Sequence, residues 1–171
     1  MELISGRKAA DLLAWAGLGE RQARAVLASG LAGDPIRAGG RLLYDADRIR
    51  GLADAAVVTR DDLAAACPDG LFVSRGRDLA GVPWAFSPWT AVWVRHRIVT
   101  TGHLAAVTTV GSFVVGWAEI VDLRRGPAGY NLVIRSACGA WPGTFADARL
   151  ITGPGRPWVL VETGPSGADA A

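Results

Sequence analysis

The spacing of apolar residues changes once along this chain of 171 residues, near residues 68–70. Before that point apolar residues recur with a helical period, and after it they form short runs typical of strands. Half of the residues are apolar, so the chain can bury a substantial core. The pattern predicts an α+β protein with a helical domain at 1–67, a strand-rich domain at 71–163 and a disordered tail at 164–171.

The helical domain is predicted to begin with two helices joined by a short turn. Ser5 can cap the first helix, and the glycines in residues 17–19 end it. The second helix spans about residues 20–29 and stops at Gly30. This arrangement predicts a helix-turn-helix unit.

A short hairpin is expected directly after the second helix. Its strands are residues 35–37 and 41–44, separated by two glycines that suit a tight turn. Asp45 or Asp47 can then cap a third helix, and Thr59 begins a capping box for a fourth. The order of helix, turn, helix, hairpin and helix is that of a winged helix.

Six short strands are predicted in the second domain, at 71–74, 89–95, 104–110, 113–121, 130–136 and 158–162. Glycine, proline and aspartate clusters separate several of them. Short strands with such turn signals favour a small, mainly antiparallel β barrel or sandwich.

Four stretches of the helical domain carry a family resemblance: Ala10-Asp11-Leu12-Leu13, residues 17–27, Gly30 and Arg41-Leu42-Leu43-Tyr44-Asp45. Together, over about residues 9–52, they resemble the winged helix-turn-helix of the excisionase and MerR-like proteins. The resemblance implies sequence-specific DNA binding, by a small transcriptional regulator or an accessory factor of excisionase type.

The register of the second helix indicates which side chains could meet DNA. Ala23, Val26 and Leu27 share one face and should pack inward, which leaves Arg21 and Arg24 outside. The predicted DNA contacts are Arg21, Gln22 and Arg24 in the major groove, Arg37 and Arg41 of the hairpin on phosphates, and Arg7 and Lys8 as auxiliary backbone contacts.

Because the basic and acidic residues nearly balance, any DNA binding must come from individual, locally placed basic side chains and not from the net charge. The chain has 18 basic and 16 acidic residues, and the two signs balance within residues 1–66. An alternative function follows from this balance. The arginines would then form an ordinary solvated face, and the helical domain would be a non-catalytic protein-interaction or scaffold module that does not bind DNA.

Tryptophan is concentrated in the second domain, where six of the seven tryptophans follow residue 80. One interpretation is a core of large aromatic side chains. The other is a ligand pocket lined by Trp84, Trp89, Trp141 and Trp158, with Arg95 at its edge. Under either interpretation, this domain could bind a protein partner or a second copy of the chain.

The sequence assigns no catalytic, cofactor or metal-binding role to any residue. His96 and His103 are the only histidines, and Cys67 and Cys138 are too far apart to form a CxxC pair. No GxSxG nucleophile motif is present. With reduced cysteines, no signal peptide and no membrane segment expected, the sequence predicts a cytoplasmic bacterial protein that is not an enzyme.

Overall fold

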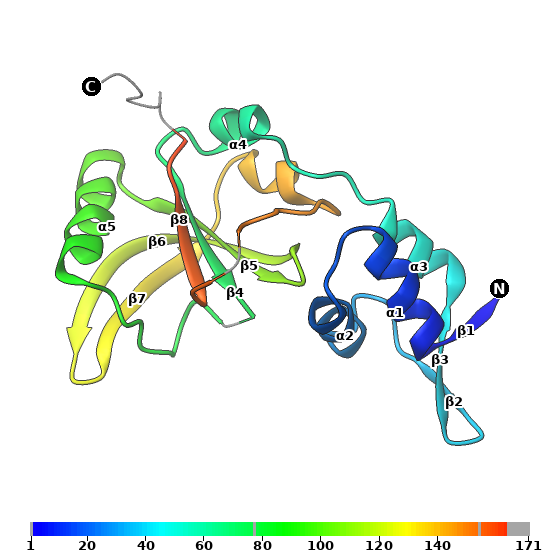
Figure 1. The fold of residues 1–171 in the computed structure, drawn as a ribbon. Helices are drawn as coiled ribbons and strands as arrows, with labels where there is room; N and C mark the ends of the chain where they lie inside the picture. Colours follow the sequence, from blue (N-terminus) through cyan, green and yellow to red (C-terminus); the bar gives the residue numbers. More distant parts are fainter. Residues whose placement is uncertain (1, 77, 154, 164–171) are drawn as a thin grey trace.

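The computed structural model describes residues 2–76, 78–153 and 155–163; the tail predicted at 164–171 lies outside them. The described residues form five α-helices, one 3-10 helix and two β-sheets (Figure 1). This mixture agrees with the predicted α+β class. No helix in these three ranges combines the length and apolar character needed to span a membrane.

The first sheet and its helices are built from the N-terminal third of the chain. The elements are β1 (Leu3–Ser5), α1 (Gly6–Trp15), α2 (Glu20–Ala28), β2 (Ile36–Ala38), β3 (Arg41–Asp45) and α3 (Ala46–Ala53). The strands form an antiparallel sheet in the order β1-β3-β2. Both helices of the first unit, the hairpin and the third helix were predicted, whereas β1 was not.

Two predicted caps fix the ends of these helices. The Ser5 hydroxyl accepts a hydrogen bond from the Lys8 amide at 3.3 Å, at the start of α1. The Asp45 carboxylate accepts one from the Asp47 amide at 2.9 Å, at the start of α3. The apolar faces of α1, α2 and α3 meet in one core that includes Leu13 of α1, Val26 of α2 and Ile49 of α3.

The second sheet has five strands. The elements are α4 (Arg60–Ala66), β4 (Leu71–Arg75), α5 (Pro88–Thr101), β5 (Leu104–Val110), β6 (Phe113–Gly126), β7 (Gly129–Ser136), the 3-10 helix η1 (Trp141–Phe145) and β8 (Trp158–Val161). The strand order is β7-β6-β5-β4-β8. β4 and β5 run parallel, and the other neighbouring pairs are antiparallel.

The predicted strand at 89–95 is wrong, because these residues belong to α5. Ser87 caps this helix through the Thr90 amide at 3.1 Å, Pro88 occupies its first turn, and Gly102 ends it with a φ of 85°. Pro and Gly suit these two places, since Pro fits a helix start and Gly the left-handed end. The caps outweigh the strand preference of the Trp- and Val-rich residues between them.

This helix also explains why the second sheet differs from the predicted barrel or sandwich. α5 connects β4 to β5, and a helical crossover of this kind allows two successive strands to run parallel. Within the described residues, β7 and β8 are the two edges of a single open sheet. The structure is therefore an open mixed sheet, neither closed nor formed of two layers of strands.

Buried side chains pack on both faces of the second sheet. One cluster contains Phe72, Trp84, Phe86 and Trp158 under α5. The other contains Leu63 of α4, together with sheet residues and η1. Helix α4 thus packs with the sheet, while α1, α2 and α3 form the separate cluster (Figure 1).

The two parts of the chain meet where the β5–β6 turn contacts α2. Phe113 of β6 is buried in the cluster formed by α1, α2 and α3. Gly111 in the turn lies so close to α2 that an added Cβ would be 2.5 Å from Cγ2 of Val26 and 3.0 Å from the carbonyl oxygen of Gln22. The position of α2 is therefore set by the sheet as well as by its own helical unit.

Candidate functional site

The predicted DNA-contacting residues of α2 are all exposed, but two of them already have partners. The Gln22 side-chain oxygen accepts a hydrogen bond from the Gly19 amide at 3.0 Å and so caps its own helix. The Arg24 guanidinium is 2.5 Å from the Glu20 carboxylate. Arg21 forms no ion pair with a described carboxylate.

The two hairpin arginines lie beside the glycine turn and are both exposed. Arg37 pairs with Leu42, and Arg41 pairs with Ala38. Because side chains alternate along a strand, this register places Arg37 and Arg41 on opposite faces of the hairpin. Neither forms an ion pair within the described ranges.

Lys8 and Arg7, the auxiliary DNA contacts predicted on α1, differ in whether they form an ion pair. The Lys8 ammonium is 3.6 Å from the Glu2 carboxylate, which also binds Arg50 at 2.6 Å. The hydrogen bond from the Arg50 guanidinium and its positive charge hold the pKa of Glu2 below its usual value. Arg7 is exposed and has no ion-pair partner among the described carboxylates.

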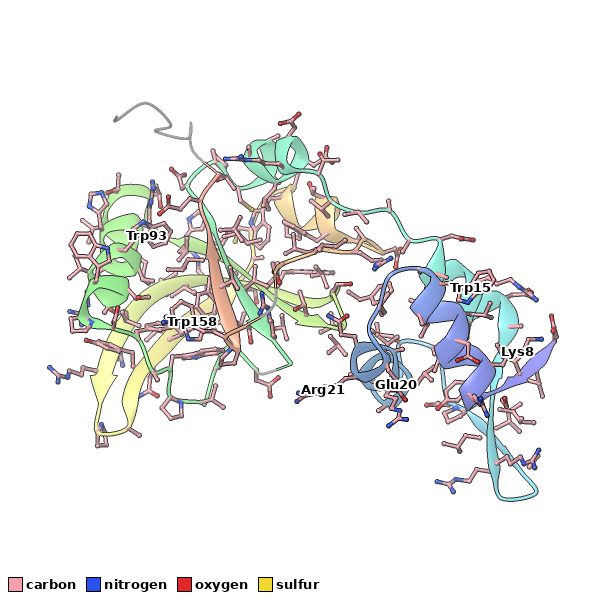
Figure 2. The ribbon with its side chains drawn as sticks, viewed as in Figure 1. Lys8, Trp15, Glu20, Arg21, Trp93 and Trp158 are labelled. Carbon is pink, nitrogen blue, oxygen red and sulfur yellow. The ribbon has the colours of Figure 1, made fainter. Side chains whose placement is uncertain are left out.

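A cleft of about 710 Å³ separates α2 from the second sheet, and we call it the arginine cleft. Four of its described lining residues are arginines: Arg21, Arg75, Arg149 and Arg156. Figure 2 shows Arg21 on the side of α2 that faces the sheet. The described lining includes no aspartate or glutamate, so its side chains carry positive charge only.

Arg149 is the most deeply placed of the four, with 5% of its surface exposed. Its Nη1 donates to the Ala16 carbonyl at 2.7 Å, and its Nε donates to the Ser112 hydroxyl at 3.4 Å. The guanidinium also lies over the Phe113 ring, 5.7 Å from the ring centroid. All of these partners are neutral, and together they join the α1–α2 connection to the second sheet.

Arg75 is also held by neutral acceptors. Its Nε donates to the Thr152 hydroxyl at 3.0 Å, its Nη1 donates to the Arg156 carbonyl at 3.0 Å, and its Nη2 donates to the Gly153 carbonyl. Burial lowers the pKa of this guanidinium from its ordinary value. Arg156 itself is exposed and lies over the Trp158 ring at 5.7 Å.

The arginine cleft was only partly predictable. The register of its helix indicates that Arg21 is exposed. Arg75, Arg149 and Arg156 come from three separate segments, and no local motif links them. A weak signal is present in the glycines around Arg156, since such segments lie in loops that border clefts.

The structure does not gather the predicted tryptophan pocket into one site. Trp84 and Trp158 are buried in the core beneath α5, where the Trp84 indole donates to the Leu79 carbonyl at 3.3 Å. Trp89 is 80% exposed on α5, and Trp141 packs against the other core cluster. Arg95 donates to the carbonyl of Leu123 at 3.1 Å, and Leu123 belongs to the same buried cluster as Trp84 and Trp158.

A buried carboxylate on the second sheet was not predicted. Glu119 accepts a hydrogen bond from Arg135 at 2.7 Å and one from the Cys138 amide at 2.9 Å, and it lies 3.7 Å from the His103 imidazole. Burial raises the pKa of Glu119, but these donors outweigh it and hold the pKa below its usual value. The second histidine, His96, lies exposed on α5.

Comparisons with protein-family models, with curated proteins and with solved structures each found no match. The functional interpretation therefore depends on the side chains and geometry described above.

Proposed function

We propose that this protein binds double-stranded DNA through α2 and the β2–β3 hairpin, in the manner of a winged helix-turn-helix. The main support for this proposal is that three arginines, Arg21, Arg37 and Arg41, are exposed and form no ion pair with a described carboxylate. Guanidinium groups available in this way can displace counterions from phosphates and donate to base edges.

Arg21 and Arg24 of α2 are both exposed, although Arg21 also borders the arginine cleft, and together they support contact with the major groove. Successive residues of a helix are separated by about 100°, so Arg21 and Arg24 project away from the buried Ala23 and Val26. The ion pair between Arg24 and Glu20 is exposed to solvent, where such pairs contribute about 0–1 kcal/mol. A phosphate or a guanine edge can therefore replace Glu20 as the partner of Arg24.

The hairpin supports contact with the DNA backbone. Arg37 and Arg41 lie on opposite faces, and the turn between them consists of two glycines without side chains. A hairpin that enters a groove of the DNA edge-on can direct one arginine to the phosphates on each side of the groove. A protein with this binding activity would act as a small transcriptional regulator or as an accessory factor in DNA rearrangement.

Fluorescence anisotropy with two labelled duplexes tests the proposal: one of random sequence, and one selected from a random pool by the protein itself. We expect Arg24→Ala to weaken binding to the selected duplex by about 1–3 kcal/mol, with little effect on the random one. We expect Arg37→Ala to weaken both duplexes equally, because phosphates carry no sequence information.

Arg60→Ala is the matched control, because Arg60 is an exposed arginine on α4, outside the proposed surface. It should bind both duplexes like the unaltered protein. Absence of binding at about 50 mM salt, or equal losses for all three variants, would reject the proposal.

A protein-interaction function is the second candidate, and exposed apolar side chains favour it. Trp15 on α1 is 92% exposed, and Trp89 and Val99 on α5 are 80% and 84% exposed. Large aromatic residues of this kind are enriched at protein interfaces. If the duplexes do not bind and a partner protein protects Trp15 or Trp89 from oxidation, the interaction function replaces DNA binding.

A further inference from the structure

We propose that the arginine cleft is a binding site for a small phosphorylated molecule, and that it shares only Arg21 with the arginines of the duplex-binding surface proposed above. The inference begins with Arg149. An arginine with 5% of its surface exposed is costly to bury unless a counter-charge or a full set of acceptors compensates its guanidinium. Arg149 has a carbonyl, a hydroxyl and an aromatic ring as neighbours, and no described carboxylate.

The other three arginines of the cleft also carry positive charges that no described carboxylate neutralises. Arg75 uses its donors on one hydroxyl and two carbonyls, so its positive charge is not neutralised either. Arg21 on α2 and Arg156 before β8 line the same cleft. Four like charges around one space repel each other, and an anion bound between them removes that repulsion.

Guanidinium chemistry identifies the class of anion. Arginine presents planar paired donors that match the oxygens of phosphate, and phosphate-binding sites use it for that reason. Carbonyl and hydroxyl acceptors already fix the orientation of the Arg75 and Arg149 guanidinium groups. Binding of a phosphate therefore costs these side chains little further freedom. Such pre-orientation favours a specific ligand over diffuse ion attraction.

The size and the apolar part of the cleft favour an organic phosphate over a free phosphate ion. Its volume of about 710 Å³ lies within the range of about 300–1,000 Å³ found for small-molecule sites. Ala25, Val110, Ile151 and Pro157 provide an apolar lining beside the arginines. A nucleotide-sized molecule offers both a phosphate and an apolar or planar part for these two surfaces.

Isothermal titration calorimetry on the full chain, in the absence of DNA, tests this inference independently of the proposed function. The probes are pyrophosphate, a nucleoside diphosphate, the corresponding nucleoside and a short single-stranded oligonucleotide. We expect the nucleoside diphosphate to bind more tightly than pyrophosphate, and the nucleoside not to bind. Binding of the oligonucleotide alone would overturn the proposal, because the phosphate would then belong to a nucleic acid.

Two variants connect the binding to the cleft. Arg149 also holds the Ala16 carbonyl, so its replacement can unfold the protein. The exposed residues Arg21 and Arg156 are therefore replaced, as Arg21→Gln and Arg156→Gln. Each should weaken nucleoside diphosphate binding roughly tenfold or more, because the substitution removes a hydrogen bond to a charged group.

Arg60→Gln is the control, because it removes the same charge on α4, outside the lining of the cleft. It should leave the affinity within about twofold of the unaltered protein, as expected for a surface substitution. Equal affinities for all three variants, or no heat from any phosphate-bearing probe, would overturn the assignment.

Discussion

Replacement of Gly111 by alanine should loosen the contact between α2 and the second sheet. Gly111 has a φ of 56°, a conformation that alanine adopts at a cost of about 1–2 kcal/mol. The new Cβ would also lie 2.5 Å from Cγ2 of Val26 and 3.0 Å from the backbone oxygen of Gln22. The backbone of α2 cannot withdraw from that contact without shifting the whole helix.

Gly39 provides a control with nearly the same positive φ and no contact. Its φ is 55°, and an added Cβ would meet nothing within 4 Å. Gly39→Ala should therefore lower the free energy of unfolding by about 1–2 kcal/mol, from conformation alone. Overpacking typically adds about 1–3 kcal/mol, so Gly111→Ala should lower it by about 2–5 kcal/mol.

Urea unfolding followed by tryptophan fluorescence measures both decreases in stability. The informative quantity is the difference between the two variants, which isolates the contact with α2 from the strain of a positive φ. A difference of about 1–3 kcal/mol supports the described junction. Equal decreases would show that the β5–β6 turn does not press on α2, and the arginine cleft would then lack one of its walls.

Three further predictions concern individual side chains. The Glu119 donors hold its folded-state pKa below the ordinary value of 4.5, so its stabilisation is present above that pH and is lost as the pH falls through the lowered pKa. Urea titrations at a series of pH values should therefore show the free energy of unfolding of Glu119→Gln approaching that of the unaltered protein in acid. A difference between the two proteins that stays constant with pH would contradict this. Iodoacetamide should label the exposed Cys138 in the folded protein but not Cys67, whose pKa burial raises to about 12, and peptide mass mapping checks this. Thr59→Ala should lower the free energy of unfolding, measured in urea, by about 1 kcal/mol. The reason is that the Thr59 hydroxyl accepts a hydrogen bond from the Asp62 amide at 3.1 Å at the start of α4. Thr59→Ser keeps a hydroxyl at this position and should retain most of the stability.

Local signals predicted most of the elements. Ser5, Asp45 and Thr59 cap α1, α3 and α4 as expected, since each places a side-chain oxygen directly before an apolar-periodic segment. The strand predicted at 104–110 matches β5 (Leu104–Val110), and glycines mark the turn that follows it. Caps and turns depend on neighbouring residues, which is why the sequence alone indicates them.

Two elements were missed, for different reasons. β1 is only three residues long and exists because it pairs with β3, some 40 residues later. α5 was predicted as a strand because Trp and Val dominate its first turns, although Ser87-Pro88 and Gly102 indicate a helix. That one change of element converts an antiparallel arrangement into a sheet with a parallel pair, because the connection between β4 and β5 becomes a helical crossover.

The candidate site shows the same division between local and distant information. The helical register alone indicates that Arg21 and Arg24 are exposed, because three buried residues define the inner face of α2. The i,i+4 pairing of Arg24 with Glu20 and the capping of α2 by Gln22 are local contacts too, but they were not predicted. Arg75, Arg149 and Arg156 join Arg21 only through tertiary folding, so no spacing in the sequence identifies the cleft.

The salt dependence of duplex binding tests the proposed DNA interface most directly. Removing one arginine that binds a phosphate should reduce the slope of log affinity against log salt concentration by about 1. The double variant Arg37→Ala with Arg41→Ala should therefore show a slope lower by about 2 than the unaltered protein. An unchanged slope would contradict a backbone contact by the hairpin.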